Sequence, residues 1–337
     1  MAFDNIKLEK GMYHEGSKPF TQVLEEQDPS ESYKGTALEG TDAFQRQLKR
    51  FGIRVKGPAS DPVEKFFATF ESSVLFPEFI SRIVRQGAEE GNLLPSIVAT
   101  VTKIDGMDYR SIFSASSGDD KRLAEVAEGA SIPATTIRTR DNVVKLHKRG
   151  RMLVASYEAL RFQKLDLFSV MLRQIGAYIH QAQLADAVAV LTEDCDALQV
   201  GSAPITDGTT AFSYAALIDF WAQFHPYEMS TMLVGGDAMA ALLKLDEFQN
   251  PATGLNFQAT GKLTTPIGAE LLRTDAVGAN KILALDRRYA LEMVQAGDIA
   301  VEYDKLIDRQ LERAAITSIC GFTTLFDEAA KQLELNA

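Results

Sequence analysis

The sequence predicts an α+β protein in which one long helix connects a strand-rich, extended segment to a compact α/β lobe. An unbroken helical period of apolar residues runs from Leu165 to Thr192, which is 28 residues and about 42 Å at 1.5 Å per residue. The residues before this helix are enriched in β-branched side chains and turn signals, as strands are. The region after it alternates short apolar strands with helices.

The N-terminal 60 residues are polar and punctuated by glycine, with nine positive and nine negative charges. This composition predicts an extended N-terminal arm at residues 1–60 rather than a domain. Within it, the segment from Thr41 to Ile53 is expected to form a short amphipathic helix with Phe44, Leu48 and Phe51 on one face.

An apolar helix follows the N-terminal arm, and then a long extended segment begins. We expect the helix to be interrupted at Pro77 and to resume through Arg85. Residues 96–113 have the composition of strands, broken at Asp105 and Gly106, and a polar, small-residue excursion follows. Two strands joined by a long polar tip have few apolar residues to bury, so this arm needs a partner.

The charge of the second strand of this arm is unusual for an acidic chain. The net charge is −11, yet the segment from Arg138 to Lys164 carries eight Lys or Arg against Asp141 and Glu158. This basic ribbon supplies the candidate residues for a subunit interface, namely Arg138, Arg140, Lys145, Lys148, Arg149 and Arg151. A block of eight acidic residues without any Lys or Arg follows between Gln174 and Leu243. Such opposite charges favour attraction between copies of the chain.

The long helix and the C-terminal third supply the remaining elements. One face of the helix is expected to bury its apolar residues, namely Phe168, Met171, Leu172, Ile175, Ile179 and Ala182. In the C-terminal third we expect strands at 231–236, 281–286, 299–303 and 313–320, a helix at 237–248 capped by Asp237, and a final short helix at 327–335.

Catalytic and metal-binding patterns are missing from the sequence. The four histidines have no HExxH or HxH spacing, no GxSxG elbow occurs, and the Gly235-Gly236 pair fits a strand-to-helix turn better than a phosphate loop. We therefore predict no catalytic residue, no cofactor and no metal site. No run approaches 18 apolar residues, so no membrane span is expected.

The order of these segments resembles the major capsid proteins of tailed double-stranded-DNA bacteriophages, which share the Hong Kong 97-type capsid fold. The stretch "AEVAEGASIPATTIRTRDNVVKLHKRGRMLVASYEAL" is similar to the family's descent from the extended loop into the spine helix. Its closing elements are Lys148, Gly150, Ser156, Glu158 and Leu160. The resemblance covers roughly residues 62 to 330.

This resemblance implies a division of the chain into the family's domains. It implies an N-terminal arm, a helix region of the peripheral domain, an extended loop, the spine helix of the peripheral domain, an α/β axial domain and the returning strands of the peripheral domain. The corresponding residues are 1–60, 61–96, 97–155, 156–196, 197–285 and 286–337.

The function implied is that of a structural subunit, not an enzyme, which self-assembles as hexamers and pentamers into the icosahedral shell around a bacteriophage DNA genome. The implied partners are other copies of the chain, the packaged double-stranded DNA through weak nonspecific contact, and separate scaffolding, portal and decoration proteins. The implied location is the virion, after assembly in the host cytoplasm. An encapsulin-type nanocompartment shell subunit is the nearer alternative, and an unidentified soluble α/β enzyme is the more remote one.

Overall fold

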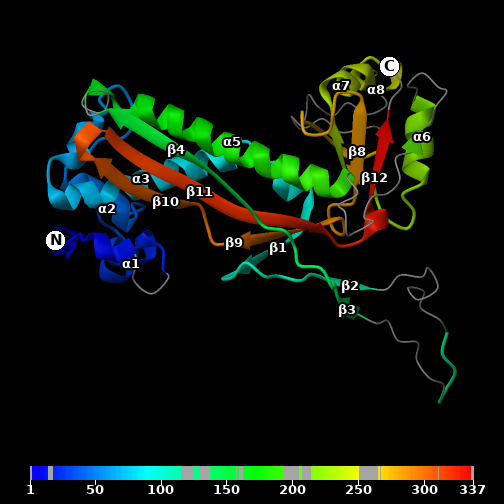
Figure 1. Cartoon of the computed structure of the whole chain (residues 1–337), viewed down its shortest axis with the longest axis horizontal. Coiled ribbons are helices and arrows are strands. Elements are labelled where there is room, and N and C mark those ends of the chain that lie inside the picture. Colours follow the sequence, from blue (N-terminus) through cyan, green and yellow to red (C-terminus); the bar gives the residue numbers. More distant parts are fainter. Residues whose placement is uncertain are drawn as a thin grey trace. The chain divides into compact units, whose positions relative to one another are not determined.

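The computed structural model of the chain is α+β, and it divides into two compact units (Figure 1). The first unit contains Met1–Gly91, Arg149–His180 and Ile299–Ser318, and the second contains Asn92–Lys148, Gln181–Asp298 and Ile319–Ala337. The structure describes residues 2–13, 18–114, 125–129, 137–156, 158, 162–192, 205–206, 214–249, 265, 267–309 and 311–334.

The N-terminal segment forms a helical layer of the first unit. It contains α1 (Phe20–Gln27) and α2 (Ala43–Arg50), joined by the 3-10 turn Ser30–Tyr33. Apolar residues from along the whole segment are buried in the core of this unit, among them Leu8, Met12, Phe20, Leu24, Phe44 and Leu48. This differs from the extended arm expected for residues 1–60, because the aromatic and aliphatic side chains reach one core although they follow no regular period.

The short helix expected between Thr41 and Ile53 is confirmed as α2. A capping box starts it: the Gln45 backbone N–H donates to the Asp42 carboxylate at 2.7 Å, and the Asp42 N–H donates to Gln45 Oε1 at 3.3 Å. These bonds satisfy two of the N–H groups that a helix start leaves without an intrahelical partner. The buried face carries Phe44 and Leu48.

A fully buried arginine joins α2 to the preceding turn. The Arg46 guanidinium donates to the Asp28 carboxylate at 2.5 Å and to Ser30 Oγ at 3.0 Å, and it lies 4.3 Å from the centre of the Tyr33 ring. The Tyr33 hydroxyl also donates to Asp28, at 2.6 Å. A buried ion pair needs such additional hydrogen bonds, because each desolvated charge must be compensated.

The helix α3 (Phe70–Glu89) continues through Pro77, where an interruption was expected. The hydroxyl of Tyr13 donates to the Val74 carbonyl at 2.7 Å and accepts from the Glu78 N–H at 3.1 Å. It therefore bridges one hydrogen bond of the helix next to the proline, where the backbone cannot keep its regular ladder. Burial and the nearby Glu78 carboxylate raise the pKa of Tyr13, so the hydroxyl keeps its proton.

The predicted long helix is confirmed as α5 (Leu165–Thr192), whose first part crosses α3 in direct backbone contact. A Cβ added to Gly176 would lie 2.0 Å from the Val84 carbonyl oxygen, and one on Gly87 would lie 2.2 Å from the Arg173 carbonyl oxygen. Only glycine permits this approach. Phe168, Leu172 and Ile179 are buried as expected, and Ile175 packs against them.

Three strands cover the first unit's helices. They are β4 (His147–Ser156), β10 (Ala300–Leu306) and β11 (Leu311–Thr324), and both β4 and β10 pair with β11. The last two confirm the strands expected near 299–303 and 313–320. The C-terminal part of β11 belongs to the second unit, where it pairs with β9 (Leu291–Ala296), which in turn runs parallel to β1 (Val98–Ile104).

The second unit contains a mixed five-stranded sheet in the order β5-β12-β8-β6-β7. Helices α6 (Tyr214–Ala222), α7 (Gly236–Leu243) and α8 (Asp246–Gln249) share a core with one face of it, and the C-terminal part of α5 packs in the core of the other face. The strands are β5 (Ile205–Thr206), β6 (Thr231–Val234), β7 (Glu270–Arg273), β8 (Lys281–Leu285) and β12 (Ala330–Glu334).

Two expectations about this lobe are corrected. The final residues form β12 instead of a helix, because they complete the sheet beside β8 and bury Ala330 and Leu333. The expected helix at 237–248 is split into α7 and α8, and its N-cap is Gly235 instead of Asp237. A Cβ on Gly235 would lie 1.9 Å from the Gly278 carbonyl oxygen, so this turn requires glycine.

Within the described part of the chain, no helix combines the length and the apolar character that crossing a membrane requires.

Candidate functional site

The arm leaves the second unit through two adjacent segments. Its strands β2 (Ile112–Ser114) and β3 (Ile137–Thr139) pair only with each other among the described strands (Figure 1). Between these strands and the rest of the second unit, the two segments remain hydrogen-bonded to each other. The Arg140 N–H donates to the Ser111 carbonyl and the Val144 N–H donates to the Tyr109 carbonyl, both at 2.8 Å. The arm therefore begins as a hydrogen-bonded ribbon.

A buried carboxylate on β9 holds one side of this arm root. Glu292 is 3% exposed, and it accepts hydrogen bonds from Thr102 Oγ1 at 2.6 Å, the Tyr109 hydroxyl at 2.7 Å and Ser111 Oγ at 2.5 Å. Burial and the bond to Glu292 raise the pKa of Tyr109, which therefore remains a donor. Three donors on one acceptor-only group fix the direction in which the first strand of the arm departs.

A buried arginine holds the other side of the root. The Arg140 side chain is 10% exposed and lies 3.9 Å from Asp327, and its Nη2 donates to the Thr324 carbonyl at 2.8 Å. Arg140 is among the cations predicted for an interface with a neighbouring copy. Within its own subunit, its side chain anchors the arm to β11 through the Thr324 carbonyl.

Three other residues of the predicted interface set do face outward. Lys145, Lys148 and Arg151 are exposed, and in the part of the chain that the structure describes no ion pair involves them. Arg149 is half-buried, and Arg138 lies on β3, where its side chain is outside the described residues. Between Lys145 and Lys148 in the sequence lies His147, whose Nδ1 is 3.4 Å from the Asp186 carboxylate. We call Lys145, Lys148 and Arg151 the outward cations.

Apolar side chains that the sequence interpretation missed are exposed on the first unit. Met152 and Val154 lie on one face of β4 and are 54% and 52% exposed. The sequence carried a signal for them, since residues two apart on a strand share a face. On α5 the exposed apolar residues are Leu167, Val170, Met171 and Tyr178. Met171 is predicted to be buried but is exposed, because the face of α5 that packs in the core is the face that carries Leu172. Exposed apolar patches of this kind mark interaction surfaces.

The described residues hold no group of three or more His, Cys, Asp or Glu side chains that could bind a metal ion. What they do hold is an anchored arm, outward cations just before β4 and along it, and exposed apolar side chains on β4 and α5. These are features of a subunit that completes itself by association with further copies.

Comparison with known proteins identifies the class. Residues 140–311 match the sequence profile of the family described as phage capsid protein. The match spans just over half of the chain, so the protein belongs to this family. No curated protein sequence matches the chain.

Two solved structures support the fold, and the score of a third is lower. A structure from Microbacterium phage Oxtober96 superimposes with a TM-score of 0.53 at 9% identity, covering 73% of this chain and 91% of that one. The capsid of a native GTA particle gives a TM-score of 0.51 at 15% identity, covering 71% and 89%. An encapsulin from Synechococcus elongatus gives 0.48 at 12% identity, covering 70% and 84%.

The chain therefore has the Hong Kong 97-type capsid fold that the sequence resemblance implied. It is a phage capsid protein, a structural component of the shell and not an enzyme. Its place is in the capsid of the virion, and it associates with copies of itself. The family match favours the phage capsid over the encapsulin alternative.

Proposed function

We propose that copies of this chain join as hexamers and pentamers because the arm of each subunit docks on a neighbouring copy, and that the closed shell encloses a double-stranded DNA genome. The observation that carries this proposal is the set of outward cations. They follow the root in the chain, just before β4 and along it, and the root itself is held on both sides, by Glu292 and by Arg140. Anchoring of the root lowers the entropy lost when the arm binds.

The acidic block between Gln174 and Leu243 is the surface that we propose for the docked ribbon. A single exposed ion pair contributes only about 0.2–1 kcal/mol. A shell repeats each contact many times, and every subunit joins several neighbours, so small terms add up to a decisive preference. Contacts between exposed charges are screened beyond about 10 Å at 0.1 M salt, and assembly should weaken as salt is raised.

We further propose that contact with the genome is weak, salt-sensitive and independent of sequence, since a chain of net charge −11 gains little from counterion release. Under this proposal residues 197–285 act as the axial domain and residues 97–155 as the extended loop. Scaffolding, portal and decoration proteins would be separate chains.

The test is a charge reversal of the outward cations alone, Lys145→Glu, Lys148→Glu and Arg151→Glu in one chain, with Arg140 left in place. We expect normal circular dichroism and thermal melting together with loss of closed shells by electron microscopy. The triple change to Gln should give an intermediate yield. The matched control reverses three exposed lysines of the N-terminal layer, namely Lys7, Lys10 and Lys56. If the triple Glu variant forms shells as the control does at every salt concentration, the outward cations do not direct assembly.

A further inference from the structure

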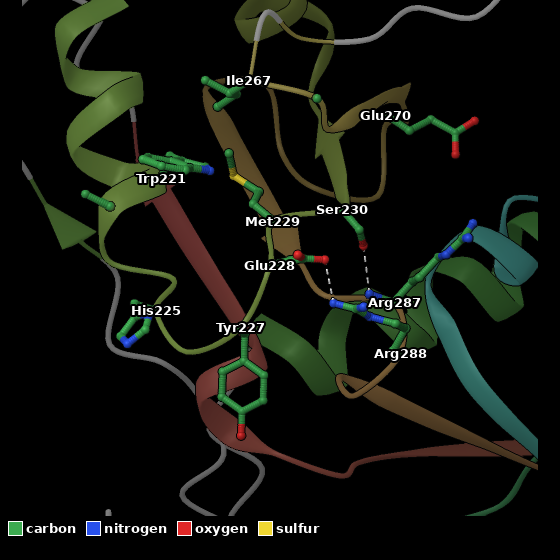
Figure 2. A pocket seen from close by; sticks show the side chains of 12 residues that line it. Trp221, His225, Tyr227, Glu228, Met229, Ser230, Ile267, Glu270, Arg287 and Arg288 are labelled. Carbon is green, nitrogen blue, oxygen red and sulfur yellow. Dashed lines mark hydrogen bonds and ion pairs between the residues drawn. The ribbon is translucent and has the colours of Figure 1, made fainter.

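A pocket of about 850 Å³ lies in the second unit, at the edge of the sheet where β6 and β7 begin and β8 ends. Figure 2 shows Trp221 from the end of α6 together with Met229 and Ile267 on one side, and the pair Arg287 and Arg288 on the other. One half of the pocket is thus apolar. The other half is charged, with Arg287 and Arg288 beside the carboxylates of Glu228 and Glu270. An occupant that fits brings an apolar side chain, and an anionic group for an arginine that is not already paired.

The two arginines differ in how far they are already paired. Arg288 donates to the Glu228 carboxylate at 2.7 Å and to the buried Asp286 carboxylate at 3.0 Å. Burial raises the pKa of Asp286, but the bonds from Arg288 and from backbone N–H groups outweigh it and hold the pKa below its usual value.

These bonds hold the turn at residues 286–288 in place. Arg287 lies within this turn and lines the pocket. The Arg287 backbone N–H donates to Ser230 Oγ at 2.9 Å, and its exposed guanidinium makes no ion pair within the described residues.

The composition of this surface is that of a protein interface. Trp221 is 48% exposed and is the chain's one tryptophan, and beside the pocket Tyr289 is 43% exposed with its ring 5.8 Å from that of Tyr227. Trp, Tyr and Arg are the residues that carry most binding energy between proteins. The chain's net charge of −11 disfavours a nucleic acid, whose phosphates it would repel.

A ring of identical subunits limits which surface can fill the pocket. Contacts in a ring are heterologous, so the pocket of one copy must meet a different surface of the next. The turn between α7 and α8 offers the required pair of groups, because Leu243 is 37% exposed and Asp246 is exposed three residues later. Neither helix lines the pocket. Ile218 and Asp219 on α6 are a similar pair, but they sit on the helix that ends at the pocket and would give a twofold contact.

We propose that the pocket receives the Leu243–Asp246 turn of the next copy, with Asp246 pairing with Arg287 and Leu243 packing against Trp221. This inference rests on the rings of the proposed function and assigns one of their contacts. It predicts that Trp221 becomes shielded when subunits assemble.

The single tryptophan makes the test direct. Fluorescence of the wild-type chain should shift to shorter wavelength, and acrylamide quenching should fall severalfold, on going from dissociated subunits to assembled particles. Arg287→Glu should lower the affinity of ring formation about thirtyfold or more, the loss that defines a hot-spot residue. The matched control is Arg273→Glu, which changes an exposed arginine at the other end of β7, and it should assemble normally.

The paired reversal Arg287→Glu with Asp246→Arg should restore assembly. Wild-type particles in which Trp221 stays as quenchable as in subunits would overturn the inference while leaving the proposed rings intact. Rescue by Asp219→Arg in place of Asp246→Arg would mean that pockets meet about a twofold axis, which also overturns it. If wild-type chains form no rings or shells at all, the proposed function fails first, and native mass spectrometry distinguishes that result.

Discussion

Arg46 in the N-terminal helical layer is completely buried, whereas Lys148 in the basic ribbon is exposed and has no ion pair in the described part of the chain. Both lie in polar, charge-rich segments, and the sequence patterns of the two segments do not distinguish them. The layer uses its charges to close its own fold, through Asp28 and the hydroxyl groups around it. The ribbon leaves its charges for another copy. Charge density alone thus does not tell which side of a subunit boundary a charged group serves.

Among the variants that test this contrast, removal of the buried ion-pair partner of Arg46 should change the free energy of unfolding most. Asp28→Ala removes the carboxylate to which the buried guanidinium donates and leaves only Glu25, 3.9 Å away; breaking such a buried pair typically costs about 3–5 kcal/mol. We expect that loss in the free energy of unfolding, measured by urea denaturation of unassembled subunits. The control is Glu31→Ala, whose carboxylate is 88% exposed and 3.9 Å from Lys34, with an expected change within about 0.5 kcal/mol. Equal losses in both variants would show that the buried pair does not hold the layer.

An intermediate effect is expected at the arm root, where the two uses of charge meet. Glu292→Gln leaves one acceptor oxygen for three hydroxyl donors, and an unsatisfied buried group costs about 1–3 kcal/mol. Hydrogen exchange should accelerate at residues 109–111 and 140–144 while the N-terminal layer is unaffected. Glu302→Gln, at an exposed position of β10, is the control. Unchanged exchange at the root would mean that Glu292 does not fix the arm.

The smallest effect is a dependence of stability on pH to which Glu25 of the layer contributes. Glu25 accepts from the Ala43 N–H at 2.7 Å and from Ser30 Oγ at 2.7 Å. Burial opposes ionisation, but these hydrogen bonds outweigh it and lower the pKa of Glu25 below its ordinary 4.5.

The folded-state pKa is the lower one, so the stabilisation is complete above 4.5 and is lost as the pH falls through the folded value. Denaturation midpoints of unassembled subunits should fall on acidification, and Glu25→Gln should reduce that fall. A variant with the wild-type dependence would remove Glu25 as its source.

Local patterns were sufficient for several elements, and in those cases the sequence alone determined the result. The helix α5 was predicted at its observed bounds, because 28 residues of regular apolar period leave no competing structure. The strands β6, β8, β10 and β11 were found because short β-branched and apolar runs between turn signals have one good solution. The basic ribbon was also visible, since charge is a property of composition.

Other features were decided only by tertiary structure. The last residues have the composition of a helix, but they form β12 because they pair with the edge of β8. Arg140 is chemically identical to Arg138, Arg149 and Arg151 in the same ribbon, and only the contact with Thr324 makes it an anchor. Met171 and Leu172 are adjacent on α5, and the position of α3 decided which of them is buried. The physical reason is common to all three: the deciding partner lies far away in sequence, and a local pattern carries no information about it.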